Sequence, residues 1–222
     1  MRVLLYVRAN HKDVKGGDLV QLYSTGEALA KEGIAVDYSS DAKKDLDKYD
    51  VIHVFNSPRF EETKRFFDNA IKHNKPIAFS SIFWSKDELA VGIAKNRSVQ
   101  FVYKTFGAAT AKKYRKLAKK IQNIKSSDSS EAIEKWLFQQ ADVLLPNSEG
   151  EMQEIKKVYG VGNNYQVVPN AINVNKFRKV PTSTRKDYVL SVGRIERRKN
   201  TMKLIVACVN KKLPLVLIGG YD

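Results

Sequence analysis

The sequence predicts an α/β fold built on a Rossmann-like, doubly wound parallel sheet. Short apolar runs of strand length alternate with amphipathic helical patterns along most of the chain. Each helical crossover returns the chain to the same end of the sheet, so successive strands run parallel. The alternation begins at Val3 and begins again at Tyr188, which predicts the start of a second Rossmann-like domain.

The first strand–helix–strand unit carries a pair of glycines where the chain passes from strand to helix. The strand is Val3–Val7, and a polar loop leads to Gly16 and Gly17. Asp18 is the expected N-cap of the following helix, and Gly33 is expected to end it. Glycines at this position let the backbone approach a phosphate, and the helix N-terminus adds positive potential. A plain turn explains the pair equally well.

Two more strands, Val51–Phe55 and Pro76–Phe79, flank an amphipathic helix at Phe60–His73. His53 lies inside the first of these strands, where a structural role in the core is favoured over a catalytic one.

A strongly basic helical pattern, Lys112–Lys125, lies in a region that lacks a convincing strand. Ser126–Ser130 is expected to be a linker after it and a cap for the helix that carries Trp136. Three interpretations stay open: a solvated helix face, contact with anionic lipid, and contact with nucleic acid. The lack of interleaved aromatic residues and of any nucleic-acid motif disfavours the third. The lysines proposed to contact a membrane are Lys112, Lys113, Lys116, Lys119 and Lys120.

The sheet pattern then resumes with strands at Ala141–Leu145 and Tyr165–Val168. Between them, Ser148 is expected to cap a helix. The polar stretch Arg178–Lys186 contains proline, serine and threonine and is the best domain boundary in the chain. This boundary predicts two domains, 1–183 and 184–222.

The stretch Tyr188–Asn200 carries the sharpest candidate for a binding site. An apolar strand ends at Gly193, and Arg194 and Lys199 follow before the next helix begins. This order of features, in which a strand is followed by a glycine, cations and the start of a helix, can form an anion site at the carboxyl edge of a parallel sheet. Arginine grips a phosphate with two hydrogen bonds and lysine supplies a point charge, so the pair suits a diphosphate. A solvated loop is the alternative.

Composition limits the remaining classes. The net charge of +15 favours polyanionic or phosphorylated partners. The single cysteine, Cys208, excludes an internal disulfide, and with three scattered histidines it predicts no metal site. The chain has no dinucleotide or P-loop glycine motif, which argues against those enzyme classes. It also shows no signal-peptide pattern and no membrane-spanning run, so a cytoplasmic location is expected.

Four segments, taken in order, resemble the retaining, nucleotide-sugar-dependent glycosyltransferases of family 4. The family's glycine pair after the first strand is similar to Gly16–Gly17. Its A-D-x-V-x-x-x-S segment resembles Ala141–Ser148, and its V-P-N-G-I-D segment with a following Phe resembles Val168–Asn173 and Phe177. Its V-G-R-L segment ending in Lys resembles Val192–Lys199.

This resemblance implies a GT-B fold, in which two Rossmann-like domains face a cleft and the first holds the acceptor. It implies that Arg194 and Lys199 bind the donor diphosphate, and that Gly16 and Gly17 approach the same phosphates. Retaining transfer in this family is thought to need no dedicated protein nucleophile, and neither a metal nor a cofactor is expected. Cations and amides stabilise the leaving diphosphate. The resemblance also implies cleft or structural-motif positions for Ser148 and Asn170.

The chain departs from the family pattern in three places. Ala171 and Asn173 replace the usual Gly and Asp. Many members have a histidine after the fourth strand, but this chain reads Ser80–Trp84 there, so no catalytic base is nominated. The family's Glu-x7-Glu motif is absent after Tyr188. We therefore expect an acceptor-side domain with the first βαβ unit of an incomplete donor domain, inactive as this chain alone.

Two functions from different classes follow. The first is a hexosyltransferase-type enzyme that moves a sugar from a nucleotide-sugar donor to a glycan or lipid-linked acceptor. This enzyme would act in cell-surface polysaccharide or glycolipid synthesis, peripherally at the inner membrane face. The second is a non-catalytic module that binds anionic lipid through Lys112–Lys125, and nucleic acid is the weakest partner. The sequence identifies neither the donor sugar, nor the acceptor, nor the linkage.

Overall fold

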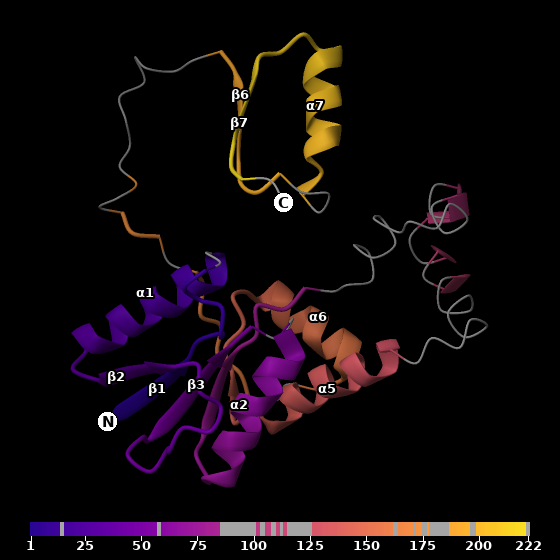
Figure 1. Ribbon diagram of the computed structural model, residues 1–222. Helices are drawn as coiled ribbons and strands as arrows, with labels where there is room; N and C mark the ends of the chain where they lie inside the picture. Colours follow the sequence, from indigo (N-terminus) through magenta and orange to yellow (C-terminus); the bar gives the residue numbers. More distant parts are fainter. Residues whose placement is uncertain are drawn as a thin grey trace. The chain divides into compact units, whose positions relative to one another are not determined.

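The structure of the protein, a computed structural model, is shown in Figure 1. Contacts divide the chain into two units. The first unit comprises Met1–Ser85 and Asn123–Ile172, and the second comprises Lys86–Gln122 and Asn173–Asp222. The predicted boundary at Arg178–Lys186 lies outside the described residues. The structure describes residues 1–13, 16–56, 59–84, 101–102, 105–107, 110–111, 113–114, 126–161, 164–170, 172–174, 177, 187–195 and 199–220.

The first unit is built on a five-stranded sheet in the order β2-β1-β3-β4-β5. Every neighbouring pair of strands is parallel, which confirms the predicted α/β, doubly wound fold class. The strand order reverses between β1 and β3, so the loops that follow these strands diverge at a topological switch point, where ligands bind in such folds. The strands are β1 (Arg2–Tyr6), β2 (Ala35–Ser39), β3 (Val51–Phe55), β4 (Ile77–Ser80) and β5 (Val143–Leu144).

Helices pack against both faces of this sheet. Alternate residues of β1 point to opposite faces, so Val3 and Leu5 join the apolar cluster that contains α1. Leu4 and Tyr6 join the larger cluster that contains the other three helices of this unit. Burial on both faces explains why β1 reads as a continuous apolar run. The helices are α1 (Gly17–Lys31), α2 (Phe60–Lys72), α5 (Ser126–Gln140) and α6 (Glu149–Tyr159).

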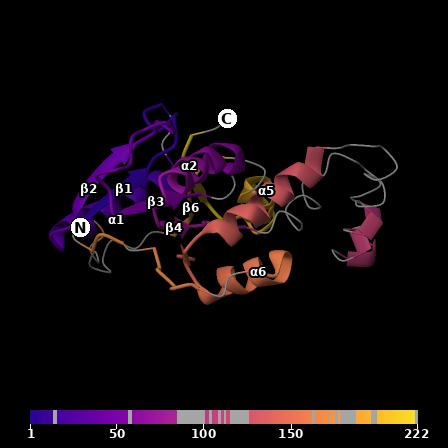
Figure 2. The ribbon, with the colours of Figure 1, turned by 90° about the horizontal axis from the view of Figure 1, so that it is seen from below.

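Aromatic contacts hold α2, α5 and α6 together, and α5 lies beside α2 in Figures 1 and 2. The ring of Trp136 lies 6.1 Å from that of Phe67, and the ring of Tyr159 lies 5.3 Å from that of Phe138. The expectation of a linker at Ser126–Ser130 is wrong, because these residues already form the first turns of α5, the helix that carries Trp136. Serine and aspartate are favoured at helix N-termini, and the packed aromatic residues further along stabilise the whole helix.

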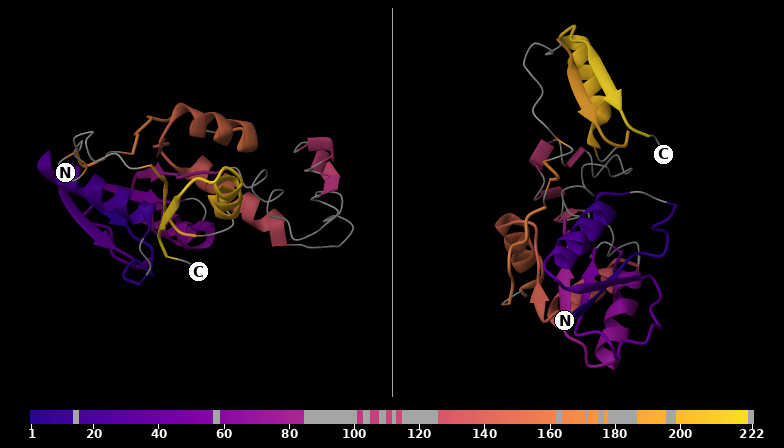
Figure 3. Two further views of the ribbon diagram at one scale, coloured as in Figure 1. Left: turned by 90° about the horizontal axis from the view of Figure 1, so that it is seen from above. Right: turned by 90° about the vertical axis from the view of Figure 1, so that its left-hand side faces the viewer.

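The second unit contains one strand–helix–strand motif among its described residues: β6 (Val189–Val192), α7 (Thr201–Asn210) and β7 (Leu215–Ile218). The two strands pair in parallel beside α7, as Figures 1 and 3 show, and this confirms the predicted βαβ order after Tyr188. Cys208 is buried, as expected for a small core residue.

The basic helix predicted at Lys112–Lys125 falls almost entirely outside the described residues. Lys113 and Tyr114 are described, and their backbone is helical. Across the described part of the chain, the structure contains no helix with the length and apolar character needed to cross a membrane.

Candidate functional site at the carboxyl edge of the sheet

The turn between β1 and α1 places Gly16 and Gly17 at the switch point of the first unit. Gly16 is the N-cap of α1, and none of the described side chains caps this helix. A Cβ atom on Gly17 would meet nothing within 4 Å, whereas one on Gly16 would collide with Asp18. The first N–H groups of a helix lack partners within it, so this turn offers donors and positive potential to an anion.

Behind the glycine turn, Arg8 forms a partly buried ion pair with Asp18. The Nε atom of Arg8 lies 2.8 Å from Oδ2 of Asp18, and the two side chains are 6% and 19% exposed. Nη1 of Arg8 donates to Oδ1 of Asn10 at 2.6 Å, and Nδ2 of Asn56 donates to Oδ2 of Asp18 at 3.2 Å. The expectation that Asp18 caps α1 is therefore wrong, because its carboxylate instead joins the loops that follow β1 and β3.

Sequence reasoning missed Arg8 and Asn56. The available signal was a cation or amide directly after an apolar strand, at the edge where doubly wound folds bind ligands. Asn56 also adopts a left-handed backbone conformation, with φ of 79°, and its carbonyl accepts a hydrogen bond from Oγ1 of Thr63 at 3.0 Å. These contacts fix the course of the β3 loop beside the glycine turn.

A small cavity of about 20 Å³ lies at the same edge. A cavity of this size holds about one water molecule. Glu62 of α2 closes one side, where its Oε1 accepts a hydrogen bond from the backbone N–H of Ala9 at 2.6 Å. The cavity is thus too small for a sugar or a nucleotide, and a ligand of that size would bind outside it. Its lining residues are Tyr6, Arg8, Asp18, Leu19, Leu22, Phe55, Asn56, Arg59, Glu62, Thr63 and Phe66.

One carboxylate, that of Glu151, joins the loops that follow β4 and β5. Its Oε1 accepts from Oγ of Ser81 at 2.5 Å and from the N–H of Phe83 at 2.7 Å. Its Oε2 accepts from the N–H of Asn147 at 2.7 Å. Ser148 is the N-cap of α6, as predicted, and its Oγ accepts from the N–H of Glu151 at 3.1 Å. The Ser-x-x-Glu spacing of a capping box could have singled out Glu151 in the sequence.

His53 of β3 is a core residue, in line with the favoured sequence interpretation. It is buried, its ring stacks on Phe55 with centroids 4.2 Å apart, and Nε2 lies 2.9 Å from Oγ of Ser80. Burial lowers the pKa of His53 to about 4, because a charged imidazolium would lose its hydration there. The imidazole is thus neutral near pH 7.

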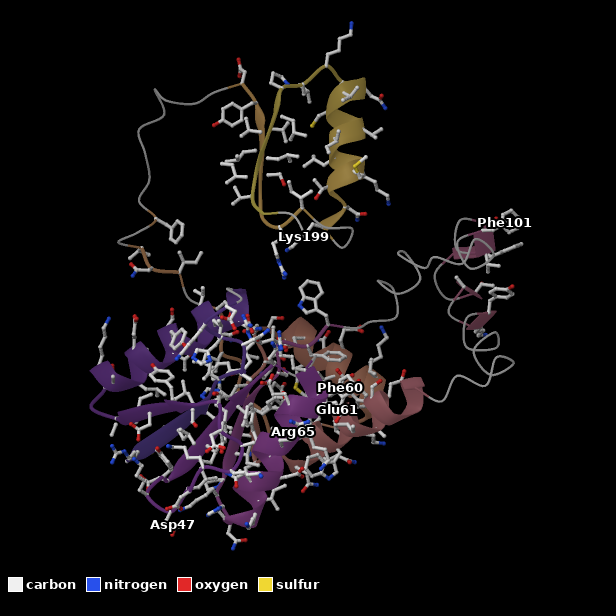
Figure 4. The ribbon with its side chains drawn as sticks, in the orientation of Figure 1. Asp47, Phe60, Glu61, Arg65, Phe101 and Lys199 are labelled. Atoms are coloured by element: carbon white, nitrogen blue, oxygen red, sulfur yellow. The ribbon has the colours of Figure 1, made fainter. Side chains whose placement is uncertain are left out.

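The second candidate anion site lies on the β6–α7 connection of the second unit. Arg194 and Lys199 are both exposed there, and Lys199 lies just before the start of α7 (Figure 4). Gly219 lets the ends of the two strands approach closely, because a Cβ on Gly219 would collide with the carbonyl oxygen of Gly193. The predicted strand and helix start are present, with Arg194 after the carboxyl end of β6 and Lys199 before the start of α7.

The other residues singled out from the sequence are placed as follows. Asn170 is exposed. It follows an extended segment that runs parallel to β5. In this segment the N–H of Val168 donates to the carbonyl of Pro146 at 2.8 Å. Lys113 is exposed. The remaining proposed membrane-contact residues lie outside the described residues; they are Lys112, Lys116, Lys119 and Lys120.

Among the described residues, one group could bring several ligand atoms to an ion. Asp45, Asp47 and His73 offer atoms within 4.8 Å of one another at the surface. They precede β3 and β4 and so lie at the amino edge of the sheet, where Figure 4 marks Asp47. This edge is opposite to the candidate site, and the cluster has no role in it.

No family model matches the chain. A search of curated proteins gives one similar segment in an enzyme from Campylobacter jejuni, N-acetylgalactosamine-N,N'-diacetylbacillosaminyl-diphospho-undecaprenol 4-alpha-N-acetylgalactosaminyltransferase. The segments are 30% identical over 89 residues, which make up 37% of this chain and 24% of that enzyme.

Two solved structures share the fold over the whole chain. Sucrose-phosphate synthase from Thermosynechococcus elongatus aligns with a TM-score of 0.67 at 16% identity, and the alignment covers 63% of that protein. Anabaena Alr3699/HepE in complex with UDP aligns with a TM-score of 0.60 at 12% identity, with 62% of that protein covered. The chain thus spans less than two thirds of the length of each of these proteins.

Proposed function

We propose that the protein is a glycosyltransferase of the retaining, nucleotide-sugar-dependent type, which transfers a hexosyl group to a glycan or lipid-linked acceptor. The observation that carries this proposal is the pair of strand–glycine–helix turns, one in each unit. The first presents Gly16 and Gly17, and the second presents Arg194 and Lys199 with both cations exposed. The activity that the Campylobacter relative is named for and the UDP bound to HepE support this choice of chemistry.

Each turn suits a diphosphate for a separate physical reason. Arg194 can make two parallel charge-assisted hydrogen bonds to phosphate oxygens, and Lys199 adds a point charge beside the start of α7. The N-terminus of α1 favours negative charge, and the open space beside Gly17 admits a ligand close to the backbone. Such donors stabilise the charge that develops on a leaving diphosphate, which is a major part of catalysis in group transfer.

No side chain is assigned as nucleophile or general base. The neutral, buried His53 contacts Ser80 and Phe55, and it lies below the edge where a substrate would sit. The proposed chemistry therefore depends on electrostatic stabilisation by Arg194, Lys199 and backbone amides. An acceptor on a lipid carrier would place the protein peripherally at the cytoplasmic face of a membrane.

Calorimetric titration of the full chain with UDP tests the proposal. We expect Arg194→Ala and Lys199→Ala each to weaken UDP binding about tenfold, since a hydrogen bond to a charged group contributes about 1.5–3 kcal/mol. Lys211→Ala is the matched control, because Lys211 is an exposed lysine at the opposite end of α7. If the double variant at Arg194 and Lys199 binds UDP as tightly as the parent, the assignment of this site is wrong.

The alternative of a non-catalytic module for anionic lipid stays a prediction from the sequence. It depends on Lys112–Lys125, of which the structure describes Lys113 and Tyr114. The described residues contain no feature that favours it over the transferase.

A further inference from the structure

The loop after β4 ends in an exposed tryptophan. Trp84 is 72% exposed, whereas its neighbour Phe83 is 7% exposed and packs edge-on against Phe138 and Tyr159, with ring centroids 5.7 Å away in both cases. Single exposed apolar residues are common on protein surfaces, so exposure alone assigns no role to Trp84. Two further features of the loop indicate a role for this residue.

The first feature is a backbone conformation that the surrounding structure must hold in place. Ile82 has φ of 48°, in the left-handed region that β-branched residues rarely adopt. Its neighbours on both sides, Ser81 and Phe83, donate hydrogen bonds to the same oxygen of Glu151. Strained conformations of this kind persist only where contacts over-determine them, and they cluster at binding and catalytic sites. The direction in which the chain reaches Trp84 is therefore fixed.

The second feature is a set of amide side chains beside this loop. Because Glu151 also accepts from the N–H of Asn147, one carboxylate joins the loops after β4 and β5. Oδ1 of Asn147 in turn accepts from Nε2 of Gln21 on α1 at 2.9 Å. Both loops lie at the carboxyl edge of the sheet, where doubly wound folds bind their ligands. The loop that ends in Trp84 thus shares this edge with amide side chains, which can both donate and accept hydrogen bonds.

We propose that Trp84 is a stacking platform for a pyranose ring of the acceptor glycan, and that Glu151 is the positioning residue that holds it. A pyranose presents an apolar face of C–H groups to an aromatic ring, and its hydroxyl groups at the rim need hydrogen-bonding partners, which polar side chains of the same sheet edge can supply. The identity of this ligand as an acceptor rests on the proposed transferase function. The stacking site itself rests on the geometry of the loop.

Tryptophan is also enriched where proteins touch a membrane. The neighbours of Trp84 favour the sugar. The loop after β5, which Glu151 joins to the loop of Trp84, carries the amide of Asn147, and α6 follows it with the acidic residues Glu149 and Glu151. Carboxylates repel an anionic membrane surface, whereas they are compatible with a neutral glycan. A membrane is therefore an outcome to be tested and not the proposed ligand.

Intrinsic fluorescence tests the proposal directly, because the chain has two tryptophans, Trp84 and Trp136. In a Trp136→Phe variant of the full chain, all indole emission comes from Trp84. We expect octyl N-acetylgalactosaminide, added below its micelle concentration, to shift this emission to shorter wavelength and to reduce quenching by acrylamide, with saturation. The matched control is Trp84→Phe, in which Trp136 is the reporter and no saturable change is expected.

Two variants then distinguish the stacking role of Trp84 from the positioning role of Glu151. Binding of the glycoside followed by saturation-transfer NMR should weaken about tenfold in Trp84→Ala, near the upper range for an aromatic contact. Glu151→Gln should weaken glycoside binding less than Trp84→Ala does, and it should make Trp84 more accessible to acrylamide. A substitution that affected only the packing of α6 would not change the accessibility of Trp84. An unchanged affinity in Trp84→Ala would overturn the proposal.

UDP titration in the same samples keeps this inference distinct from the proposed function. Glycoside binding without UDP binding would leave Trp84 as a sugar site and would refute the transferase. UDP binding without a saturable response of Trp84 to N-acetylgalactosaminide, glucoside or galactoside would refute the sugar site and leave the transferase. A response of Trp84 to phosphatidylglycerol vesicles but to none of these glycosides would overturn the proposal in favour of a membrane contact.

Discussion

The partly buried ion pair between Arg8 and Asp18 gives the most direct test of how the carboxyl edge is held together. Replacing Arg8 by Met keeps an unbranched side chain but leaves the Asp18 carboxylate, which is 19% exposed, without its cation. Breaking a buried pair from one side costs about 3–5 kcal/mol. Asp18 retains some exposure and the hydrogen bond from Asn56, so we expect the lower end, about 3 kcal/mol.

Urea denaturation followed by tryptophan fluorescence measures this loss in the first unit, because both Trp84 and Trp136 lie there. With a urea dependence of about 2 kcal/mol per molar, the midpoint should fall by about 1.5 M. Arg59→Met is the matched control. Arg59 lies at the same edge, is 40% exposed in its pair with Glu62 at 3.7 Å, and should contribute less than about 1 kcal/mol.

A double-mutant cycle then separates the pair from the packing of its side chains. Asp18→Asn removes the charge that Arg8→Met leaves unpaired, so the double variant should recover most of the lost stability. The reasoning is refuted if Arg8→Met costs less than about 1 kcal/mol, or if the two substitutions add without coupling.

Two further predictions concern His53 and the second unit. The pKa of His53 is lowered from 6.5 to about 4 by burial, so the unfolded chain takes up a proton on acidification before the folded protein does. Stability should therefore fall between pH 6.5 and 4 by up to about 3 kcal/mol, and urea denaturation of His53→Gln should show a flatter pH dependence. In the second unit, Gly219→Ala should disrupt the β6–β7 pair, because the new Cβ would collide with the carbonyl oxygen of Gly193. Gly220→Ala should be tolerated, since nothing lies within 4 Å of its added Cβ; hydrogen exchange of β6 amides compares the two, and equal protection would contradict this.

The fold class and several local features could be predicted because they depend on residues close in sequence. The apolar runs of β1 and β3 and the helix start at Ser148 each follow from a local pattern. The glycine turns at Gly16 and Gly193 could also be predicted from local pattern, since in each case a strand, a glycine and a helix follow one another in the chain. Asp18 shows the limit of such reasoning. It is a good N-cap by type, but Arg8, in the loop after β1, is a stronger partner and binds it.

The contacts that build the candidate site could not be predicted in this way. Glu151 meets Ser81, which lies 70 residues earlier, and Asn56 meets Asp18, which lies 38 residues earlier. The Ser-x-x-Glu spacing indicates a capping box, yet the carboxylate of Glu151 is used to hold the loop of β4. Hydrogen-bonding partners of this kind depend on which strands become neighbours, and local pattern does not determine that.

The sequence by itself determined the kind of sheet, the order of strands and helices, and the placing of glycines and cations at the ends of β1 and β6. Only the tertiary structure decided which side chains meet at the carboxyl edge: Arg8 with Asp18, and Glu151 with the loop that presents Trp84. The physical reason is the range of the forces involved. Hydrophobic periodicity and backbone preference act within a few residues, whereas burial removes water from distant polar groups and makes each take whichever partner the fold brings within hydrogen-bonding distance.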